Sequence, residues 1–396
     1  MKLLSINAGS SSLKFRLYDM PEEKLIIKGM FERIGQLGSG YTIRIGEKKT
    51  SELIELNNHD DAVKTLLEKL IELKVINSLD EIEAVGHRIV HGGNKYSKSV
   101  IINDRVLLEL ENISELAPLH NPAALKGVYA FNRNIPNALM VACFDTAFHQ
   151  TIDEASYLYP VPYEWYVKYD VRKYGFHGLS HKYISEKLNN ILNKKANLII
   201  CHIGNGASIS AIKEGKCIDT SMGFTPNAGI MMGTRSGDID YSIIDYIMKK
   251  EERNLTWVEN KLNKASGLEG ITGMSDLRDV DRAFEANEKK AMLAMKMYTE
   301  RIIKYIAQYY VKLDGNVDAL CFTAGGGEND SIIRGEVLKK LKSLGIELDE
   351  EKNNNTIVRN GIEGTITKDS SSIPAYVLAT DEELMIARDT YELGYK

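Results

Sequence analysis

The sequence predicts a two-domain α/β protein in which one small structural device occurs twice. The first copy spans residues 3–14 and the second spans residues 198–210; each reads as an apolar strand, a turn rich in small polar residues, and a second strand. At 396 residues the chain is too long for one core of ordinary size, which favours two domains. Two such hairpins far apart in one chain therefore indicate a duplicated fold.

Both turns have the composition of a phosphate-binding loop. Glycine lets the backbone approach a bulky anion, and consecutive N–H groups in such a turn form an anion-binding concavity. Lys14 adds a positive charge beside the first turn. An ordinary turn is the alternative for either hairpin alone, because Asn, Gly and Ser dominate turns. The recurrence of the pattern favours phosphate binding.

Composition narrows the class of protein. An apolar fraction of 43% and a charged fraction of 27% are typical of a globular protein, and the formal charge of 50 − 55 = −5 gives no support for nucleic-acid binding. The four cysteines occur singly, which argues against a zinc site and suits a reducing compartment. The chain begins with a strand pattern, and no run approaches the roughly 20 apolar residues of a membrane span. We expect a cytoplasmic protein.

Apolar periodicity and turn residues predict the elements of the first half. A helix near 60–74 is supported by the spacing of Val63, Leu66, Leu67, Leu70 and Ile71. The predicted strands are 3–6, 13–18, 83–86 and 138–144. The last two strands each end in a polar cluster, and ligands in open α/β sheets bind beyond the carboxyl ends of strands.

The second half begins with a crossing segment that contains Pro160 and Pro162. The predicted order is then a helix after 177–178, hairpin 198–213, a glycine-rich loop at 219–238, a long helix near 289–312, strand 318–323, a glycine turn at 323–329, a helix near 330–342, strand 375–379 and a final helix. The glycine turn is a third candidate phosphate loop, because the helix after it would point its N-terminus at an anion.

Two arginines and two carboxylates stand at loops or strand ends. Arg88 and Arg235 have glycines nearby, and arginine offers a planar fork for carboxylate or phosphate; a surface ion pair is the alternative. Asp145 and Glu382 could hold Mg²⁺ directly or through water, or could act as a helix cap or an ion-pair partner.

Histidines are frequent near the predicted strand ends, at positions 87, 91, 120, 149, 177, 181 and 202. The chain has no HExxH motif, so a metal cage is not expected. His177 and His181 are four residues apart and could share a metal on one helix face. We interpret the pair instead as one active-site and one structural histidine.

Taken together, the motifs resemble the acetate kinase family from residue 3 to about residue 390. The resemblance rests on residues 7–14, 87–93, 144–149, 174–178, 202–206, 232–238 and 323–329. It implies an α/β fold of two duplicated actin-like, or ribonuclease H-like, domains with mixed sheets flanked by helices and an active-site cleft between them. The domains would be residues 1–150, with a C-terminal helix at about 381–396 packing back on them, and residues 151–380, which carry most of the nucleotide site.

The resemblance implies reversible, Mg²⁺-dependent phosphorylation of acetate by ATP, giving acetyl phosphate and ADP by direct in-line transfer, with Mn²⁺ able to replace Mg²⁺. The implied catalytic residues are Asp145, His177, Arg235 and Arg88. Acetate would be bound by Arg88, Val90, Leu119, His120, Phe176 and Pro226. ATP would be bound by Ser10, Ser12, Lys14, His202, Ile203, Gly204, Asn205, Gly206, Asp276, Leu277, Arg278, Gly325, Gly326, Gly327, Glu328 and Asn329. Asn7 and Glu382 would bind the metal, and the protein would be a homodimer.

Two positions depart from the usual family pattern. Gly326 stands where isoleucine is common, which bears on nucleotide affinity, and Asp381 stands where asparagine is usual, which bears on metal preference. Propionate kinase or butyrate kinase is the main alternative, because one methylene changes specificity by only about 1–3 kcal/mol. A sugar kinase would need a general base such as Asp145, and an actin-like ATPase would leave residues 87–93 unexplained.

Overall fold

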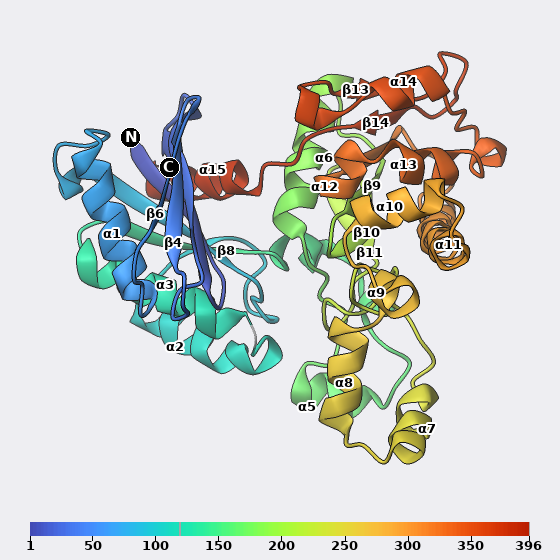
Figure 1. The fold of residues 1–396 in the computed structure, drawn as a ribbon, viewed down its shortest axis with the longest axis horizontal. Coiled ribbons are helices and arrows are strands. Elements are labelled where there is room, and N and C mark those ends of the chain that lie inside the picture. Colours follow the sequence, from blue (N-terminus) through green and yellow to red (C-terminus); the bar gives the residue numbers. More distant parts are fainter. Residues whose placement is uncertain (119, 396) are drawn as a thin grey trace. The chain divides into compact units, whose positions relative to one another are not determined.

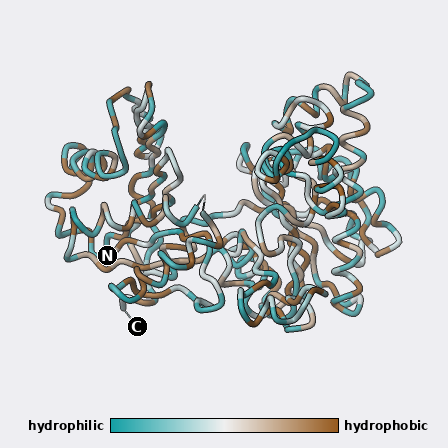
Figure 2. Tube along the Cα trace, turned by 90° about the horizontal axis from the view of Figure 1, so that it is seen from below, coloured by the Kyte–Doolittle hydropathy of each residue, from teal (hydrophilic) through white to brown (hydrophobic). Residues whose placement is uncertain are grey.

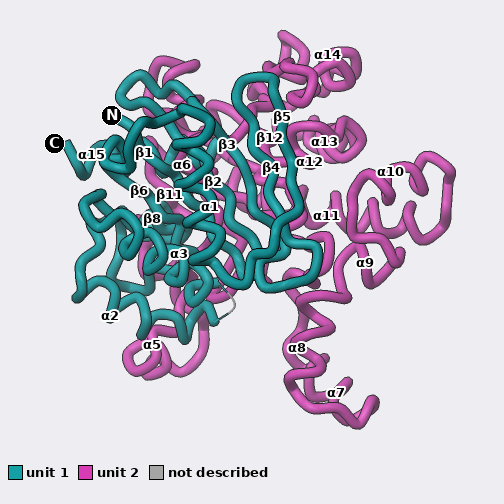
Figure 3. The backbone as a smooth tube through the Cα atoms, turned by 60° about the vertical axis from the view of Figure 1, so that its left-hand side comes forward, with its two compact units in different colours: residues 1–150, 381–396 teal, residues 151–380 magenta. Residues whose placement is uncertain are grey.

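The computed structural model describes residues 1–118 and 120–395, which divide into two compact units (Figures 1 and 3). The first unit consists of Met1–Gln150 together with Asp381–Lys396, and the second is Thr151–Thr380. No helix in the described part of the chain is long and apolar enough to cross a membrane.

The sheet of the first unit has the strand order β5-β4-β3-β2-β1-β6-β8-β7. Strands β1, β2 and β3 pair antiparallel, whereas β1, β6 and β8 run parallel. The strands are β1 Lys2–Ala8, β2 Ser12–Asp19, β3 Lys24–Glu32, β4 Gly40–Ile45, β5 Lys48–Leu53, β6 Ile82–Ile89, β7 Val100–Ile101 and β8 Leu139–Phe144.

The sheet of the second unit, in the order β11-β10-β9-β12-β14-β13, repeats this arrangement. Strands β9, β10 and β11 pair antiparallel, and β9, β12 and β14 run parallel, as β1, β6 and β8 do. The strands are β9 Leu198–Ile203, β10 Ala207–Lys213, β11 Lys216–Thr220, β12 Ala319–Thr323, β13 Gly364–Thr365 and β14 Ala375–Val377. The predicted duplicated α/β fold with mixed sheets and flanking helices is confirmed.

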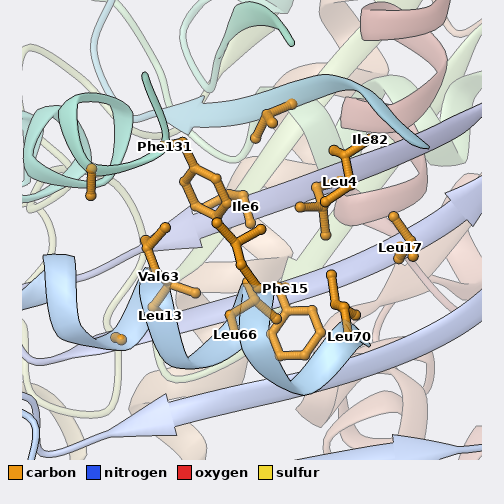
Figure 4. Close-up of a cluster of buried hydrophobic side chains, with 14 of the residues drawn as sticks. Leu4, Ile6, Leu13, Phe15, Leu17, Val63, Leu66, Leu70, Ile82 and Phe131 are labelled. Atoms are coloured by element: carbon orange, nitrogen blue, oxygen red, sulfur yellow. The ribbon is translucent and has the colours of Figure 1, made fainter. Parts of the chain in front are cut away.

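Helices cover both faces of the first sheet, because alternate residues of β1 point to opposite sides. Leu4 and Ile6 pack with Leu66 of α1 and Phe131 of α3 (Figure 4), whereas Leu3 packs with Ala387 of α15. The helices of this unit are α1 His59–Glu72, α2 Asp104–Ile113, α3 Asn121–Asn134 and α15 Glu382–Tyr395. The central residues of β1 are therefore buried on both faces of the sheet.

The helices of the second unit are shorter on average, with α11 as the long exception. They are α4 Glu154–Tyr157, α5 Tyr163–Tyr169, α6 Gly178–Leu192, α7 Ser242–Glu251, α8 Leu255–Lys264, α9 Gly267–Thr272, α10 Leu277–Glu285, α11 Lys289–Lys312, α12 Ala324–Asn329, α13 Ser331–Leu338 and α14 Glu350–Asn355. Hydrophobic and hydrophilic stretches alternate along the chain (Figure 2), as amphipathic helices packed on a core require.

Three local expectations differ from the structure. The glycine segment predicted as a turn is helix α12, which begins at Ala324 with a φ of +63°. The Ala324 N–H donates a hydrogen bond to Glu328 Oε1 at 3.0 Å. Strand β6 extends to Ile89, so Arg88 lies in the strand and not after it. The segment predicted as a crossing between halves belongs to the second unit and contains the short helices α4 and α5.

Candidate active site

In the first unit, the predicted phosphate turn joins β1 to β2. The turn is tight: Gly9 N donates to the Ser12 carbonyl at 2.9 Å, and a Cβ on Gly9 would lie 2.8 Å from Ser12 Oγ. The ring of His59, the first residue of α1, contacts the Gly9 carbonyl through Nε2 at 2.7 Å. Ser10 at the tip is exposed, and Asn7 is half-buried at the end of β1. The loop is thus anchored from α1, and its tip is open to a ligand.

A charged cluster lies at the carboxyl ends of two parallel strands of the same unit, β6 and β8. Arg88 in β6 donates from Nε to Asp145 Oδ1 at 3.0 Å and from Nη2 to Asp145 Oδ2 at 2.6 Å. Glu382, the first residue of α15, approaches Arg88 Nε at 3.9 Å. Burial raises the pKa of Glu382 to about 7, although the Arg88 charge opposes this rise. One guanidinium therefore links two carboxylates that are nearly 240 residues apart in sequence.

These oxygens suit Mg²⁺ chemically. Mg²⁺ prefers hard oxygen ligands and keeps several waters, so one or two carboxylates with substrate phosphates suffice. Glu382 is a partly buried carboxylate whose ionisation would be favoured by a cation. Within residues 1–118 and 120–395 there is no group of three or more His, Cys, Asp or Glu side chains placed to hold a metal. By their chemistry, the carboxylates of this cluster fit Mg²⁺ as one or two protein ligands.

Two charged residues near this cluster, Asp381 and Lys14, have local partners. Asp381 accepts from Arg16 Nη1 at 2.7 Å and from the Leu384 N–H at 2.8 Å, so it caps α15 and is paired. Lys14, predicted to face ATP, forms a 2.6 Å ion pair with Glu383. The charge of Asp381 is therefore compensated by Arg16.

Three further residues of this unit are predicted to bind acetate, and the structure describes two of them, Val90 and His120. Val90 follows β6 directly and is half-buried, close in sequence to Arg88. His120 is exposed and precedes α3. Leu119 lies outside the described residues.

In the second unit, histidines and an arginine gather beside the second hairpin. His177 precedes α6 with a left-handed backbone, φ 58° and ψ 24°, which is uncommon for a residue with a side chain. Its ring stacks on His202 at the end of β9, with centroids 4.1 Å apart and an angle of 19°. A Cβ on Gly206 would lie 3.5 Å from His177 Nε2 and 3.4 Å from Arg235 Nη1. The imidazole and the guanidinium therefore face the same glycine.

Arg235 comes from the long irregular segment between β11 and α7. Its Nη1 donates to the Pro226 carbonyl at 3.0 Å, and burial lowers its pKa. Pro226 is half-buried, whereas Phe176, next to His177, is almost fully buried. These predicted acetate-site residues of the second unit thus lie around one loop system.

A cavity of about 500 Å³ opens in the second unit between the ends of β9, α10 and α12. Of the predicted ATP residues, the lining includes Gly204, Asn205, Asp276, Leu277, Arg278, Gly325, Gly326 and Asn329. It also includes Ser275, Asp281, Asp330 and Arg359, which sequence reasoning missed. Asp281 and Ser275 are close in sequence to predicted residues, whereas Arg359 carries no such signal; its N–H donates to Asn329 Oδ1 at 2.9 Å.

Helix ends shape this cavity. Asp276 caps α10, accepting the Arg278 N–H at 3.0 Å, and also pairs with the Arg278 guanidinium. Two predicted residues support α12 from within: Glu328 accepts the Thr380 N–H at 3.0 Å, and the Gly327 carbonyl accepts from buried Arg334 at 2.9 Å. Three others, His202, Ile203 and Gly206, belong to the adjoining hairpin.

Asp281 and Asp330 form a carboxyl pair at the cavity wall. Asp330 Oδ1 caps α13 by accepting the Ile332 and Ile333 N–H groups at 2.9 and 3.0 Å. Burial and the neighbouring Asp330 raise the pKa of Asp281 to about 8. The pair therefore keeps a proton to a higher pH than an isolated aspartate would, which lowers the negative charge of the cavity wall.

The chain is similar to known proteins over its full length. Residues 2–388 match the model of the acetokinase family. An acetate kinase from Bacillus cytotoxicus is 50% identical over 99% of both chains. Among solved structures, an acetate kinase from Porphyromonas gingivalis matches with a TM-score of 0.93 and 42% identity over 99% of both chains. A propionate kinase from Francisella tularensis matches with a TM-score of 0.93 and 41% identity over 99% of both chains. With this coverage and identity, the chain belongs to the acetokinase family.

Proposed function

We propose that this chain catalyses the reversible transfer of the γ-phosphoryl group of ATP to acetate, forming acetyl phosphate and ADP. The observation that carries the proposal is the convergence of His177 and Arg235 on Gly206, in the hairpin that also contributes Gly204 and Asn205 to the 500 Å³ cavity. Family membership and the relatives named acetate kinase give the reaction its substrates.

The reaction needs no general base. Acetate has a pKa near that of a side-chain carboxyl, about 4 to 5, so it is an anion at neutral pH. The task is to hold two anions that repel each other and to stabilise charge on the moving phosphoryl group. Arginine forks, an imidazole N–H and backbone N–H groups suit that task. Asp145, whose two oxygens bind Arg88, is then an organiser of the arginine and not a base.

Each arginine has a distinct role in this proposal. Arg88 uses Nε and Nη2 on Asp145, and Nη1 has no hydrogen-bond partner among the described residues, so Nη1 would bind the acetate carboxylate. Arg235 would contact acetate and the phosphoryl group, and His177 would donate from Nε2 to a phosphoryl oxygen. Val90, Leu119, Phe176 and Pro226 would contact the methyl group, with His120 nearby.

The remaining predicted residues hold the nucleotide and its metal. The cavity of the second unit would bind ATP, with Asp276–Arg278 and Gly325–Asn329 around it. Ser10, Ser12 and Lys14 would face the phosphates from the first turn. Asn7 and Glu382 would hold Mg²⁺, directly or through water; when bound, the ion neutralises phosphate charge.

Propionate kinase is the second candidate, because a propionate kinase structure is 41% identical to this chain. One additional methylene in an apolar pocket is worth only about 1–3 kcal/mol. We further propose a homodimer in the cytoplasm; the four cysteines are all free thiols, which suits a reducing compartment.

Trapping the product with hydroxylamine tests the function. Mg²⁺-ATP is incubated with acetate, propionate or butyrate, and acyl hydroxamate is measured. Acetate-dependent hydroxamate, with less from the longer acids, is the expected result. More product from propionate would favour propionate kinase, and ATP hydrolysis without hydroxamate would reject carboxylate phosphorylation.

A further inference from the structure

A buried serine joins the predicted active-site histidine to a second histidine. Ser208 lies in β10 with no exposed surface, and its Oγ is 3.0 Å from Nδ1 of His177 and 2.8 Å from Nε2 of His181. His181 lies in the first turn of α6, four residues after His177, and is also buried. A single hydroxyl thus contacts one nitrogen of each ring.

Proton counting limits how these three groups can be arranged. A serine hydroxyl has one proton to donate, and a neutral imidazole has one N–H and one bare nitrogen. If Ser208 donates to Nδ1 of His177, the ring proton of neutral His177 must be on Nε2. Nε2–H of His181 can then donate to the Ser208 oxygen. Both contacts of the Ser208 hydroxyl are satisfied in this arrangement, and Nε2 of His177 is protonated on the side of Gly206 and Arg235.

The surroundings favour a neutral His177 over a cationic one. Arg235 Nη1 faces the same glycine, and a positive charge nearby disfavours a second one. The His202 ring stacks on the His177 ring with centroids 4.1 Å apart, and Nδ1 of His202 is 2.8 Å from Ser180 Oγ. In a neutral ring the tautomer decides whether Nε2 donates or repels an anion, and the hydrogen bond to the other nitrogen sets the tautomer.

We propose that Ser208, together with His181, is a positioning pair that fixes the proton of His177 on Nε2, so that this nitrogen donates to the phosphoryl group in transit. The inference rests on the proposed function for its catalytic meaning, but the tautomer itself is a property of the protein alone. The left-handed backbone of His177 fits this view, since strained residues persist where the surroundings hold them.

Nitrogen NMR of the histidine rings reads the tautomer directly. The protein is labelled with ¹⁵N-histidine, and the His177 signals are identified by their loss in His177→Gln. The expected result is a protonated Nε2 and an unprotonated Nδ1 for His177. A His177 with its proton on Nδ1 would overturn the proposal without any variant of Ser208.

Substitutions at two serines of β10 distinguish the positioning role of Ser208 from a role in packing alone. Ser208→Ala should shift the His177 signals towards a tautomer mixture and lower kcat about tenfold, the value of one hydrogen bond, with KM nearly unchanged. Ser208→Thr keeps the hydroxyl and should restore the wild-type signals. Ser210→Ala is the matched control: Ser210 is equally buried in β10 but pairs with Thr220 at 2.8 Å, so both readouts should stay at wild type.

The outcomes distinguish this proposal from the proposed function. If Ser208→Ala lowers the melting temperature but leaves the His177 signals unchanged, Ser208 is structural and the proposed positioning pair is rejected. If Ser208→Ala shifts the His177 tautomer as expected while the wild-type protein makes no acyl phosphate, the positioning pair is supported and the proposed function is rejected.

Discussion

At the scale of single residues, the ion pairs of Arg88 show that a substrate-binding residue is also part of the fold. Asp145 is almost fully buried, and Arg88 supplies the charge that balances it and Glu382. We therefore expect Arg88→Ala to lose activity and also about 3–5 kcal/mol of stability, the cost of leaving a buried charge unpaired. Hydroxamate formation and urea unfolding measure the two losses.

A double variant separates these two effects. Arg88→Ala with Asp145→Ala removes both partners, so it should recover part of the unfolding free energy without recovering activity. Arg88→Lys should keep the charge but lose the fork, so activity returns only in part. Full activity of Arg88→Ala, or equal stability of the single and double variants, would contradict this account.

Asp281 predicts a pH dependence of stability. Its pKa is raised to about 8 in the folded state by burial and by Asp330, whereas an unfolded aspartate has a pKa near about 4. Between these values the folded state binds more protons than the unfolded state, so stability falls as pH rises from about 4 to 8. Asp281→Asn cannot ionise, so its stability relative to wild type should increase over this range and level off above pH 8.

Thermal melts between pH 5 and pH 9 check this expectation. The carboxylates whose charges raise the pKa of Asp281 are Asp330, Glu285 and Asp276, and all three are retained in Asp281→Asn. Asp279→Asn is the control, because Asp279 lies on the same helix but is exposed and paired with Arg282. A difference between Asp281→Asn and wild type that does not change with pH would contradict the shared proton.

At the scale of elements, strands and long helices followed from sequence pattern, but the glycine segment did not. The long helix α11 and the two hairpins were predicted nearly to the residue because their apolar spacing is clear. The segment 324–329 was predicted as a turn, because three glycines disfavour a helix. The contact that favours the helix, Glu328 with Thr380, joins residues 52 apart and leaves no mark on local pattern.

Helix α12 also explains the unusual Gly326. A Cβ there would lie 2.8 Å from Leu277 Cδ1 and 3.0 Å from the Ile203 carbonyl, whereas a Cβ on Gly325 has no atom within 4 Å. Alanine is favoured over glycine in a helix by about 1 kcal/mol, but overpacking costs about 1–3 kcal/mol. We expect Gly325→Ala to raise the melting temperature and Gly326→Ala to leave it unchanged or lower it.

Adding Leu277→Ala tests the cause. It removes the side chain that a Cβ on Gly326 would meet, so the double variant should lose less stability than the two single losses together. Additive losses in calorimetry would mean that Leu277 is not what makes glycine necessary. Because Leu277 lines the cavity, we also expect the variants that lose the most stability to have the highest KM for ATP.

At the scale of the whole molecule, the duplication was visible in the sequence but the grouping of residues within each unit was not. The repeated hairpin indicated two related sheets, and the strand orders agree. By contrast, Glu382 lies beside Arg88 because α15 packs on β6 of the first unit. Contacts between residues almost 300 positions apart depend on the fold and leave no local sequence pattern. Arg359, which meets Asn329 from 30 positions away, was missed for the same reason.

Two segments of the second unit expose large apolar side chains, which bears on the proposed homodimer. Large hydrophobic side chains are exposed along segment 161–169, including Trp165 and Tyr169, and along segment 239–246, including Tyr241 at 83% and Tyr246 at 60%. Exposed apolar patches of this kind mark association surfaces.

We expect a mass of twice the 44.4 kDa of one chain in sedimentation velocity. Tyr241→Asp with Tyr246→Asp should shift the protein towards monomer, whereas Leu37→Asp, at a 96% exposed leucine of the first unit, should not. A monomeric wild type at micromolar concentration, or equal dissociation by Leu37→Asp, would place association elsewhere.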